Sequence, residues 1–252
     1  MAKPLPDQLP IAAEWSGVSL FLDFDGTLAP LVDRPEDARM SPETGQAITR
    51  LTDLTGGAVA VISGRALSDL DARMAPLVLP ASGSHGVEIR VAEGRTTMRG
   101  ASSDPLRKPA TSLREYATKH ALLIEEKPGA VTLHYRSEPG LEDACKALVE
   151  TLTADEPSLR TLHGHMVSEI ALAGIDKGSA LRHFMGIPPF QGRVPIMAGD
   201  DVTDEDAIVA AQSLGGIGIK IGDAPTAAHY RAQDINVFLT WLAHTSASVG
   251  TE

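Results

Sequence analysis

The sequence predicts an α/β protein in which a parallel sheet is covered by helices on both faces and a smaller α+β domain is inserted. Buried strands alternate with amphipathic helices over residues 18–79 and again over 177–221, a pattern typical of parallel strands joined by helices. Between them, strands alternate apolar and polar residues, as in an antiparallel sheet with one exposed face. We therefore expect residues 1–100 and 171–252 to form a core domain, and residues 101–170 to form the inserted domain.

The first half of the core is predicted from short apolar runs and helical patterns. Residues 18–22 and 58–62 are apolar runs with the length of buried strands, and a shorter strand is expected over 77–79. Ser41 precedes Pro42 and an apolar pattern of helical spacing. We expect Ser41 to cap this helix and Pro42 to be its first residue. A second helical pattern follows the second strand.

The second half of the core repeats the alternation. A helix is expected to open at Asp176, and a strand over 194–198 follows it. A further helix over 206–211 and a strand over 216–221 complete the series. The residues after Leu242 are expected to fray, as chain ends commonly do.

Composition excludes several classes of function. The chain of 252 residues has 22 lysines and arginines and 33 aspartates and glutamates, a net charge of 22 − 33 = −11. This balance argues against binding to nucleic acid or anionic membranes, which require a basic surface. No apolar run approaches the ~18 residues of a membrane span. The single cysteine, Cys145, excludes an internal disulfide and is expected in the core. We expect a cytoplasmic monomer.

Two carboxylates follow the first predicted strand. Asp23 and Asp25 lie two residues apart at its C-terminal end, where open α/β sheets bind ligands. One carboxylate could attack an electrophile while the other transfers protons, and together they could help hold a divalent cation. A calcium-binding EF-hand loop starting at Asp23 would need glycine and glutamate where the chain has Leu28 and Arg34. An inert acidic turn is the other alternative.

Three further elements fall at strand ends or helix starts of the same predicted sheet. Ser63 follows the second strand, where it could hold a phosphate oxygen or cap the next helix. Lys177 lies at a helix N-terminus, which disfavours a cation unless an anion binds there; a solvated lysine is the alternative. Asp200 and Asp201 follow a strand, and the carboxylates of 204–206 suit the start of the next helix.

Taken in chain order, these residues resemble the signature of the haloacid-dehalogenase (HAD) superfamily of phosphotransferases. That signature reads here as Asp23-x-Asp25-Gly-Thr, Ser63, Lys177 and Gly-Asp200-Asp201-x-x-Asp204. The resemblance covers nearly the whole chain and implies a Rossmann-like HAD core with an inserted type-2 cap domain. Other runs resemble trehalose-6-phosphate phosphatases: Ile62-Ser63-Gly64-Arg65, residues 83–90, Glu125-x-Lys127, His134-Tyr135-Arg136, residues 199–205 and residues 220–231.

The resemblance implies a two-step hydrolysis of a phosphate monoester. Asp23 would attack phosphorus to form an aspartyl-phosphate, and Asp25 would protonate the leaving sugar oxygen and then deprotonate the attacking water. Ser63 and Lys177 would hold the phosphoryl oxygens. Mg²⁺ would offset the negative charge. The implied metal-binding residues are Asp23, Asp200, the backbone carbonyl of Asp25, and Asp204 nearby.

The resemblance also implies a sugar-phosphate substrate, trehalose 6-phosphate, which is hydrolysed to trehalose and phosphate. The proline that often follows the family's glutamate is absent after Glu169. A HAD phosphatase for another sugar phosphate, of the sucrose 6-phosphate or mannosyl-phosphoglycerate type, is one alternative, and a non-catalytic phospho-receiver module is another. The residues implied to bind substrate are Arg65, His85, Gly86, Glu125, Lys127, Arg136 and Glu169.

Overall fold

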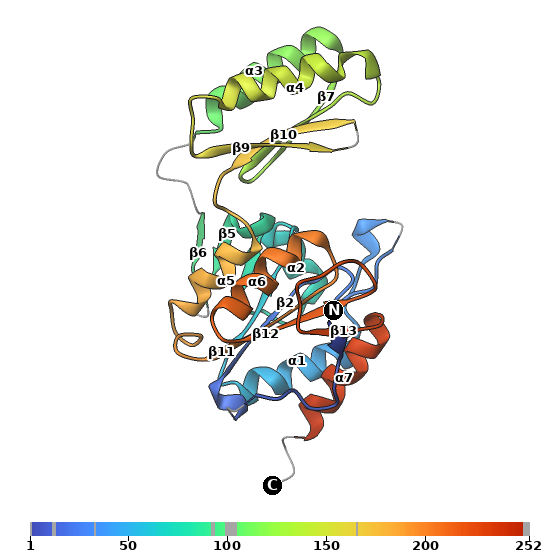
Figure 1. Ribbon diagram of the computed structural model, residues 1–252, viewed down its shortest axis with the longest axis vertical. Helices are drawn as coiled ribbons and strands as arrows, with labels where there is room; N and C mark the ends of the chain where they lie inside the picture. The colour runs from blue at the N-terminus through green and yellow to red at the C-terminus, as the bar shows by residue number, and fades with distance from the viewer. Residues whose placement is uncertain are drawn as a thin grey trace. The chain divides into compact units, whose positions relative to one another are not determined.

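The computed structural model of the chain (Figure 1) consists of two compact units. The first unit comprises Met1–Thr97 and Asp176–Glu252, and the second comprises Met98–Ile175. The predicted inserted domain falls inside the second unit, but its first boundary, after residue 100, lies outside the described residues. The structure describes residues 2–11, 14–32, 34–91, 94–98, 105–164 and 166–248.

The first unit is built on a large, mostly parallel sheet. Its strands are β1 (Lys3–Pro4), β2 (Val18–Leu22), β3 (Val59–Ile62), β4 (Ala81–Gly83), β5 (Glu88–Arg90), β6 (Thr96–Met98), β11 (Val194–Gly199), β12 (Ile217–Ile221) and β13 (Tyr230–Ala232). Among the described residues their order is β1-β13-β12-β11-β2-β3-β4-β5-β6. All pairs from β1 to β4 are parallel, and β5 joins β4 antiparallel.

The order of the strands reverses between β2 and β11. From β2 the chain proceeds through β3 and β4 in one direction, and from β11 it proceeds through β12 and β13 in the other. In open α/β sheets, ligands bind outside the C-terminal ends of the strands at such a reversal. The topology therefore places the most favourable ligand site at the ends of β2 and β11.

Helices cover both faces of this sheet (Figure 1). Alternate strand residues face opposite sides, so Leu20 and Leu22 belong to one buried cluster and Phe21 to the other. The ring centroid of Phe21 lies 5.4 Å from that of Phe190. The first cluster packs against α1 (Pro42–Leu54), α2 (Leu67–Met74) and α7 (Ile235–Ser248), and the second against α5 (Lys177–Met185) and α6 (Glu205–Ser213).

The second unit is a four-stranded antiparallel sheet with two helices. Its strands are β7 (Leu123–Lys127), β8 (Ala130–His134), β9 (Leu159–Gly164) and β10 (Val167–Leu172), in the order β7-β8-β10-β9. The helices α3 (Arg107–His120) and α4 (Glu142–Thr153) lie on one face of the sheet (Figure 1). Along the chain these elements follow the order helix, two strands, helix and two strands, and their antiparallel sheet agrees with the alternating pattern of the sequence. Short 3-10 helices lie at Trp15–Gly17, Pro35–Asp37, Ser84–Gly86, Pro139–Leu141 and Val202–Asp204.

Both predicted helix starts are confirmed. The Ser41 hydroxyl accepts a hydrogen bond from the Thr44 N–H at 3.1 Å, and Pro42 is the first residue of α1. Asp176 caps α5 by accepting from the Ser179 N–H at 2.6 Å. Each cap satisfies one of the N–H groups that a helix start leaves without a partner.

Two of the predicted elements are wrong. The strand expected over 77–79 lies instead at Ala81–Gly83, because Pro80 has no N–H to donate and Val78 is exposed. The chain does not fray directly after Leu242, since α7 continues to Ser248 and buries Thr245. Within the described residues, every helix is too short or too polar to cross a membrane.

Candidate active site

The predicted catalytic residues lie at one edge of the large sheet. Asp23 directly follows β2, Ser63 follows β3 and Asp200 follows β11. These strands are parallel neighbours, so their C-terminal ends lie side by side. The Asp23 N–H donates to the carbonyl of Ala198 at 3.0 Å, which extends the ladder of β2 and β11 to this aspartate. The large sheet thus fixes the bases of the loops that carry Asp23, Ser63 and Asp200, while Lys177 is the first residue of α5.

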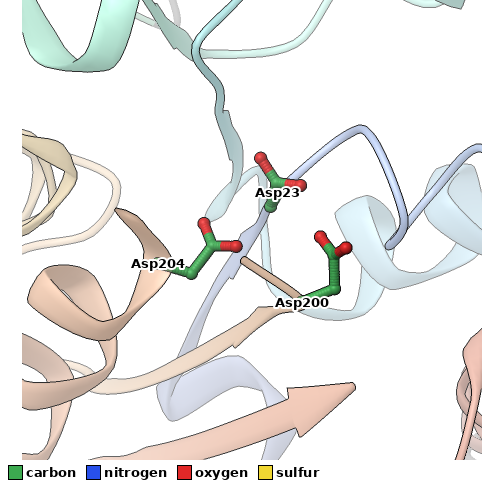
Figure 2. A group of neighbouring side chains, drawn as sticks. All are labelled: Asp23, Asp200 and Asp204. Atoms are coloured by element: carbon green, nitrogen blue, oxygen red, sulfur yellow. The ribbon is translucent and has the colours of Figure 1, made fainter. Parts of the chain in front are cut away.

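Three carboxylates converge at this edge, as Figure 2 shows. Asp23, Asp200 and Asp204, called the acidic group below, each present an oxygen within 4.8 Å of the others. Gly26 makes this approach possible: its φ of +77° is left-handed, and a Cβ there would lie 2.1 Å from Asp200 Oδ2. The glycine of the predicted Asp-x-Asp-Gly-Thr motif therefore makes room for the Asp200 carboxylate.

Lys177 is buried against two members of the acidic group. Its Nζ donates to Asp23 Oδ1 at 2.7 Å and to Asp204 Oδ1 at 2.6 Å. The Lys177 side chain is only 3% exposed, so it is not the solvated lysine that the sequence left open. The second oxygen of Asp204 accepts from the Asp201 N–H at 2.9 Å. Asp204 therefore holds Lys177 and the acidic loop together.

The acidic group carries more negative charge than Lys177 can offset. Burial raises the pKa of Asp23 well above that of an ordinary carboxyl, with Lys177 opposing the shift and Asp204 adding to it. Burial, followed by Asp204 and Asp201, raises the pKa of Asp200 to about 6. Burial by itself lowers the pKa of Lys177, but Asp23 and Asp204 together raise it above its ordinary value. In all three cases the neighbouring carboxylates raise the pKa, so they favour positive charge at this site.

The acidic group fits a divalent cation. Asp200 Oδ1 is buried and accepts no hydrogen bond from the described residues. A buried carboxylate oxygen without a partner is costly, and carboxylate oxygens are ligands that hard cations such as Mg²⁺ prefer. The donor set of Asp23 and Asp200, with Asp204 beside them, therefore suits the divalent metal that HAD phosphatases use.

The Asp25 carboxylate points to a different partner. Both of its oxygens accept from Arg65, with Nε at 2.5 Å and Nη2 at 2.6 Å. Its side chain is not part of the acidic group, so a metal-ligand role for Asp25 rests on its backbone carbonyl and stays a prediction. The hydrogen bond to Asp25 is the main cause that raises the pKa of Arg65 above its ordinary value. The substrate role predicted for Arg65 is untested, and its guanidinium is engaged with carboxylates here.

Ser63, His85 and Gly86 lie beside one another in the first unit. The Ser63 hydroxyl oxygen accepts from the Arg65 N–H at 3.2 Å, and the Ser63 carbonyl accepts from the His85 N–H at 3.0 Å. Gly86 has a φ of +110°, and a Cβ there would lie 2.5 Å from the carbonyl oxygen of Asp176. The short helix Ser84–Gly86 therefore connects the loop after β3 to the start of α5.

Two residues predicted to bind substrate, Glu125 and Glu169, lie on one face of the second unit's sheet, with Thr132 between them. Glu125 stands opposite Thr132, and Thr132 stands opposite Glu169. The Thr132 hydroxyl donates to Glu169 Oε2 at 2.6 Å. Because side chains alternate along a strand, this polar face is the one turned away from the buried Leu133 and Ile170. The helices α3 and α4 lie on one face of the sheet (Figure 1) and contact β8 and β10.

The other two residues predicted to bind sugar belong to the same unit. Lys127 pairs with Glu125 at 2.8 Å, and His134 Nε2 lies 3.2 Å from the other oxygen of Glu125. Lys127 is the largest cause that lowers the pKa of Glu125. Arg136 is exposed and follows β8. Four of the seven predicted substrate residues thus lie in the second unit and three in the first.

Sequence reasoning missed several charged residues that support the site. Lys220 is fully buried, donates to the Asp201 carbonyl at 3.0 Å and pairs with Glu205 at 3.4 Å. Asp69 and Arg73 continue the ion pairs of Arg65 along α2. The four-residue spacing from Arg65 to Asp69 to Arg73 is visible in the sequence, but such spacing is also common on exposed helix surfaces.

The fold and this site define a phosphatase of the haloacid-dehalogenase superfamily. Acidic residues follow β2 and β11, a serine follows β3 and a buried lysine begins α5. A solved structure described as a haloacid dehalogenase-like hydrolase from B. subtilis has the same fold, with a TM-score of 0.62 and 16% identity. The match covers 92% of this chain and 99% of that one.

The chain belongs to the trehalose-phosphatase family, whose model matches residues 21–236. It is 33% identical to the trehalose-6-phosphate phosphatase of Escherichia coli (strain K12) over 96% of this chain and 90% of that one. It shares the fold of a trehalose-6-phosphate phosphatase from Aspergillus fumigatus, with a TM-score of 0.76, 24% identity, and coverage of 98% and 100%. The protein is accordingly a phosphatase of trehalose biosynthesis, a phosphoric monoester hydrolase acting on a sugar phosphate.

Proposed function

We propose that the protein hydrolyses trehalose 6-phosphate to trehalose and phosphate with Mg²⁺, through an aspartyl-phosphate on Asp23. The observation that carries this proposal is the acidic group with Lys177 buried against it. Gathering three carboxylates, two of them buried, around one lysine is unfavourable for stability, and such clusters of perturbed groups are typical of reaction sites.

In the first step, an Asp23 oxygen forms a bond to phosphorus while the bond from phosphorus to the sugar oxygen breaks. Lys177 holds Asp23 Oδ1 at 2.7 Å and so orients the nucleophile. The same ammonium, together with the Ser63 hydroxyl, would attract the phosphoryl oxygens as charge develops on them. Water then attacks the aspartyl-phosphate, releases phosphate and regenerates the Asp23 carboxylate.

Asp25 would move the protons of both steps. It would donate a proton to the leaving sugar oxygen and later accept one from the attacking water, help that is worth roughly 10²–10⁴-fold in rate. To donate, the Asp25 carboxyl must free at least one oxygen from the arginine fork of Arg65. Arg65 would therefore set where the Asp25 carboxyl lies before the proton moves.

Mg²⁺ would be held by Asp23 and Asp200, with the Asp25 carbonyl as a further ligand and Asp204 adjacent. When bound, it neutralises negative charge on the phosphate and on the acidic group. Asp200 Oδ1, which is buried without a hydrogen bond from the described residues, supports this assignment. Asp204 would contribute mainly through Lys177, because both of its oxygens accept from the chain.

The second unit would act as the cap that recognises the sugar. Glu125, Lys127, Arg136 and Glu169 would bind the hydroxyl groups of trehalose, while Arg65, His85 and Gly86 would contribute from the first unit. The support is chemical: charged donors and acceptors suit a polyhydroxylated ligand without an apolar surface. The polar face, formed by Glu125, Thr132 and Glu169, provides such groups on a rigid sheet.

The test is a panel of phosphate-release rates measured with purified protein and Mg²⁺. Trehalose 6-phosphate should give the highest kcat/KM, above sucrose 6-phosphate, mannosyl-phosphoglycerate and simple hexose phosphates. A faster rate on one of these would change the substrate and keep the enzyme class. A chelator should abolish release, and added Mg²⁺ should restore it. Turnover that survives complete metal removal would refute the metal assignment.

A further inference from the structure

An alternating series of carboxylates and guanidinium groups leads from Asp25 to helix α2. Arg65 donates Nε and Nη2 to Asp25, and it donates Nη1 to Asp69 Oδ2 at 2.7 Å. Arg73 in turn donates Nε to Asp69 Oδ2 at 2.9 Å and Nη2 to Asp69 Oδ1 at 2.6 Å. Asp69 therefore joins two guanidinium groups, and its two oxygens accept three hydrogen bonds.

The series ends on the backbone of the first unit. Arg73 Nη1 donates to the carbonyl of Glu36 at 2.7 Å and to that of Ala38 at 3.2 Å. The side chains of Arg65 and Arg73 are only 12% and 8% exposed. Paired, largely buried guanidinium groups are held far more firmly than an exposed pair on a helix surface. The geometry thus fixes the Arg65 guanidinium at both of its ends.

We propose that Asp69 is a positioning residue for phosphoryl transfer: by holding the Arg65 guanidinium, it fixes the orientation of the Asp25 carboxyl. This inference rests on the proposed role of Asp25 as the proton donor. Arg65 is a long side chain with many rotamers, and its guanidinium lies over the Phe24 ring at 5.7 Å from the ring centroid. The hydrogen bond from its far nitrogen to Asp69 further restricts the direction in which its planar fork faces Asp25. Small misplacements of a reacting group cost large factors in rate.

A purely structural role for Asp69 is the alternative, since the same ion pairs also tie α2 to residues 36–38. The two roles differ in which reactions they affect. A stabilising contact influences all substrates equally, whereas a misplaced Asp25 slows the first step only for substrates whose leaving oxygen needs a proton. The second step, hydrolysis of the aspartyl-phosphate, is the same for every substrate. A sugar alkoxide is a poor leaving group that needs the proton, but p-nitrophenolate is a stable anion that leaves without it.

The experiment compares Asp69→Asn with the parent protein, both purified as the full chain with Mg²⁺. We expect kcat on trehalose 6-phosphate to fall about tenfold to a hundredfold, with a smaller change in KM. Rapid-quench measurements should show a similar loss in the rate at which the aspartyl-phosphate forms from trehalose 6-phosphate, whereas its rate of formation from p-nitrophenyl phosphate should fall less than about threefold. Equal losses in this first step for both substrates would overturn the proposal in favour of a structural role.

A matched control lies on the same helix. Asp71 accepts from Arg90 Nη1 at 2.6 and 2.7 Å, away from Asp25. Asp71→Asn removes a comparable ion pair of α2 and should leave kcat on both substrates near the parent values. If Asp71→Asn lowers kcat on trehalose 6-phosphate as much as Asp69→Asn does, the loss comes from α2 and the proposal fails. Should Asp69→Asn not fold, Arg73→Met, which loosens the same carboxylate, takes its place.

A double variant tests whether Asp69 acts through Asp25. If it does, adding Asp69→Asn to Asp25→Asn should cost no further activity, because groups that act as a unit are not additive. Additive losses would overturn the positioning role.

The same set of variants separates this inference from the proposed function. If Asp25→Asn itself spares trehalose 6-phosphate hydrolysis, then the acid role of Asp25 is wrong. If Asp25→Asn loses this activity but Asp69→Asn retains it, then only the positioning role of Asp69 is wrong.

Discussion

The acidic group of the first unit and the polar face of the second unit are built in opposite ways. Asp23 and Asp204 come from different loops and are buried, with side chains 5% and 0% exposed. Glu125 and Glu169 lie on strands of one sheet, on either side of Thr132, and the Glu125 side chain is 41% exposed. The acidic group keeps its charges away from water, whereas the polar face exposes its charged side chains to water.

The contrast separates two tasks within one enzyme. Buried charges interact strongly because little water screens them, which suits the stabilisation of a charged transition state. Half-exposed side chains exchange water for sugar hydroxyls at modest cost, which suits selection among similar ligands. Changes in the acidic group should therefore lower kcat, and changes on the polar face should raise KM.

The largest effect is expected for the nucleophile. Asp23→Asn should lower kcat on the order of 10⁴-fold or more, because the amide cannot form the aspartyl-phosphate. Acid-quenched protein analysed by mass spectrometry should contain the phosphorylated chain in the parent and lack it in the variant. A variant that releases phosphate at near the parent rate would refute the nucleophile assignment and remove the distinction between the two regions.

An intermediate effect is expected for the proposed metal ligand. Asp200→Asn should raise the Mg²⁺ concentration needed for half-maximal activity by at least about 10–100-fold, the loss that follows when a residue supporting a metal ligand is removed. Asp201→Asn is the matched control, since Asp201 is the adjacent carboxylate and lies outside the acidic group. Titration of activity with Mg²⁺ measures both variants. An equal shift for both would indicate a general electrostatic effect instead of a ligand.

The smallest effect is expected on the polar face. Glu169→Gln should raise KM for trehalose 6-phosphate about tenfold, with kcat within about threefold, since a hydrogen bond to a charged group contributes about 1.5–3 kcal/mol. Glu126→Gln is the matched control, because Glu126 is on the same sheet but pairs with Arg114 at 2.5 Å. Steady-state kinetics distinguish the two. A loss in kcat alone for Glu169→Gln would contradict a role in sugar recognition.

Much of the candidate site was predictable because its residues are tied to strand ends. Asp23, Ser63 and Asp200 each follow an apolar run, and parallel strands bring their C-terminal ends together whatever the loops do. Lys177 was predictable from its unusual place at a helix N-terminus. The core and the antiparallel sheet of the second unit followed from their different hydrophobic periods.

Side-chain partners were not predictable in the same way. Asp25 lies two residues from Asp23, yet it pairs with Arg65, forty residues further along the chain. Lys220 begins one of the runs that resemble the family, but the sequence assigned it no role, because its contact with the Asp201 carbonyl exists only in the folded sheet. The strand predicted over 77–79 was misplaced because apolar content alone was used to place it. Pro80 has no N–H to donate, and the strand begins after it, at Ala81.

The sequence by itself determined most of the strands and helices that carry the site, the family resemblance and the residues at the strand tips. The strands and helices follow from local periodicity, and the resemblance follows from motifs that the chain carries in order. Only the tertiary structure decided that Lys177 is buried between Asp23 and Asp204 and that Asp69 and Arg65 hold Asp25. Such pairings depend on distances between residues that are far apart in the chain. They also depend on burial, which sets the strength of the electrostatic interaction between the paired charges.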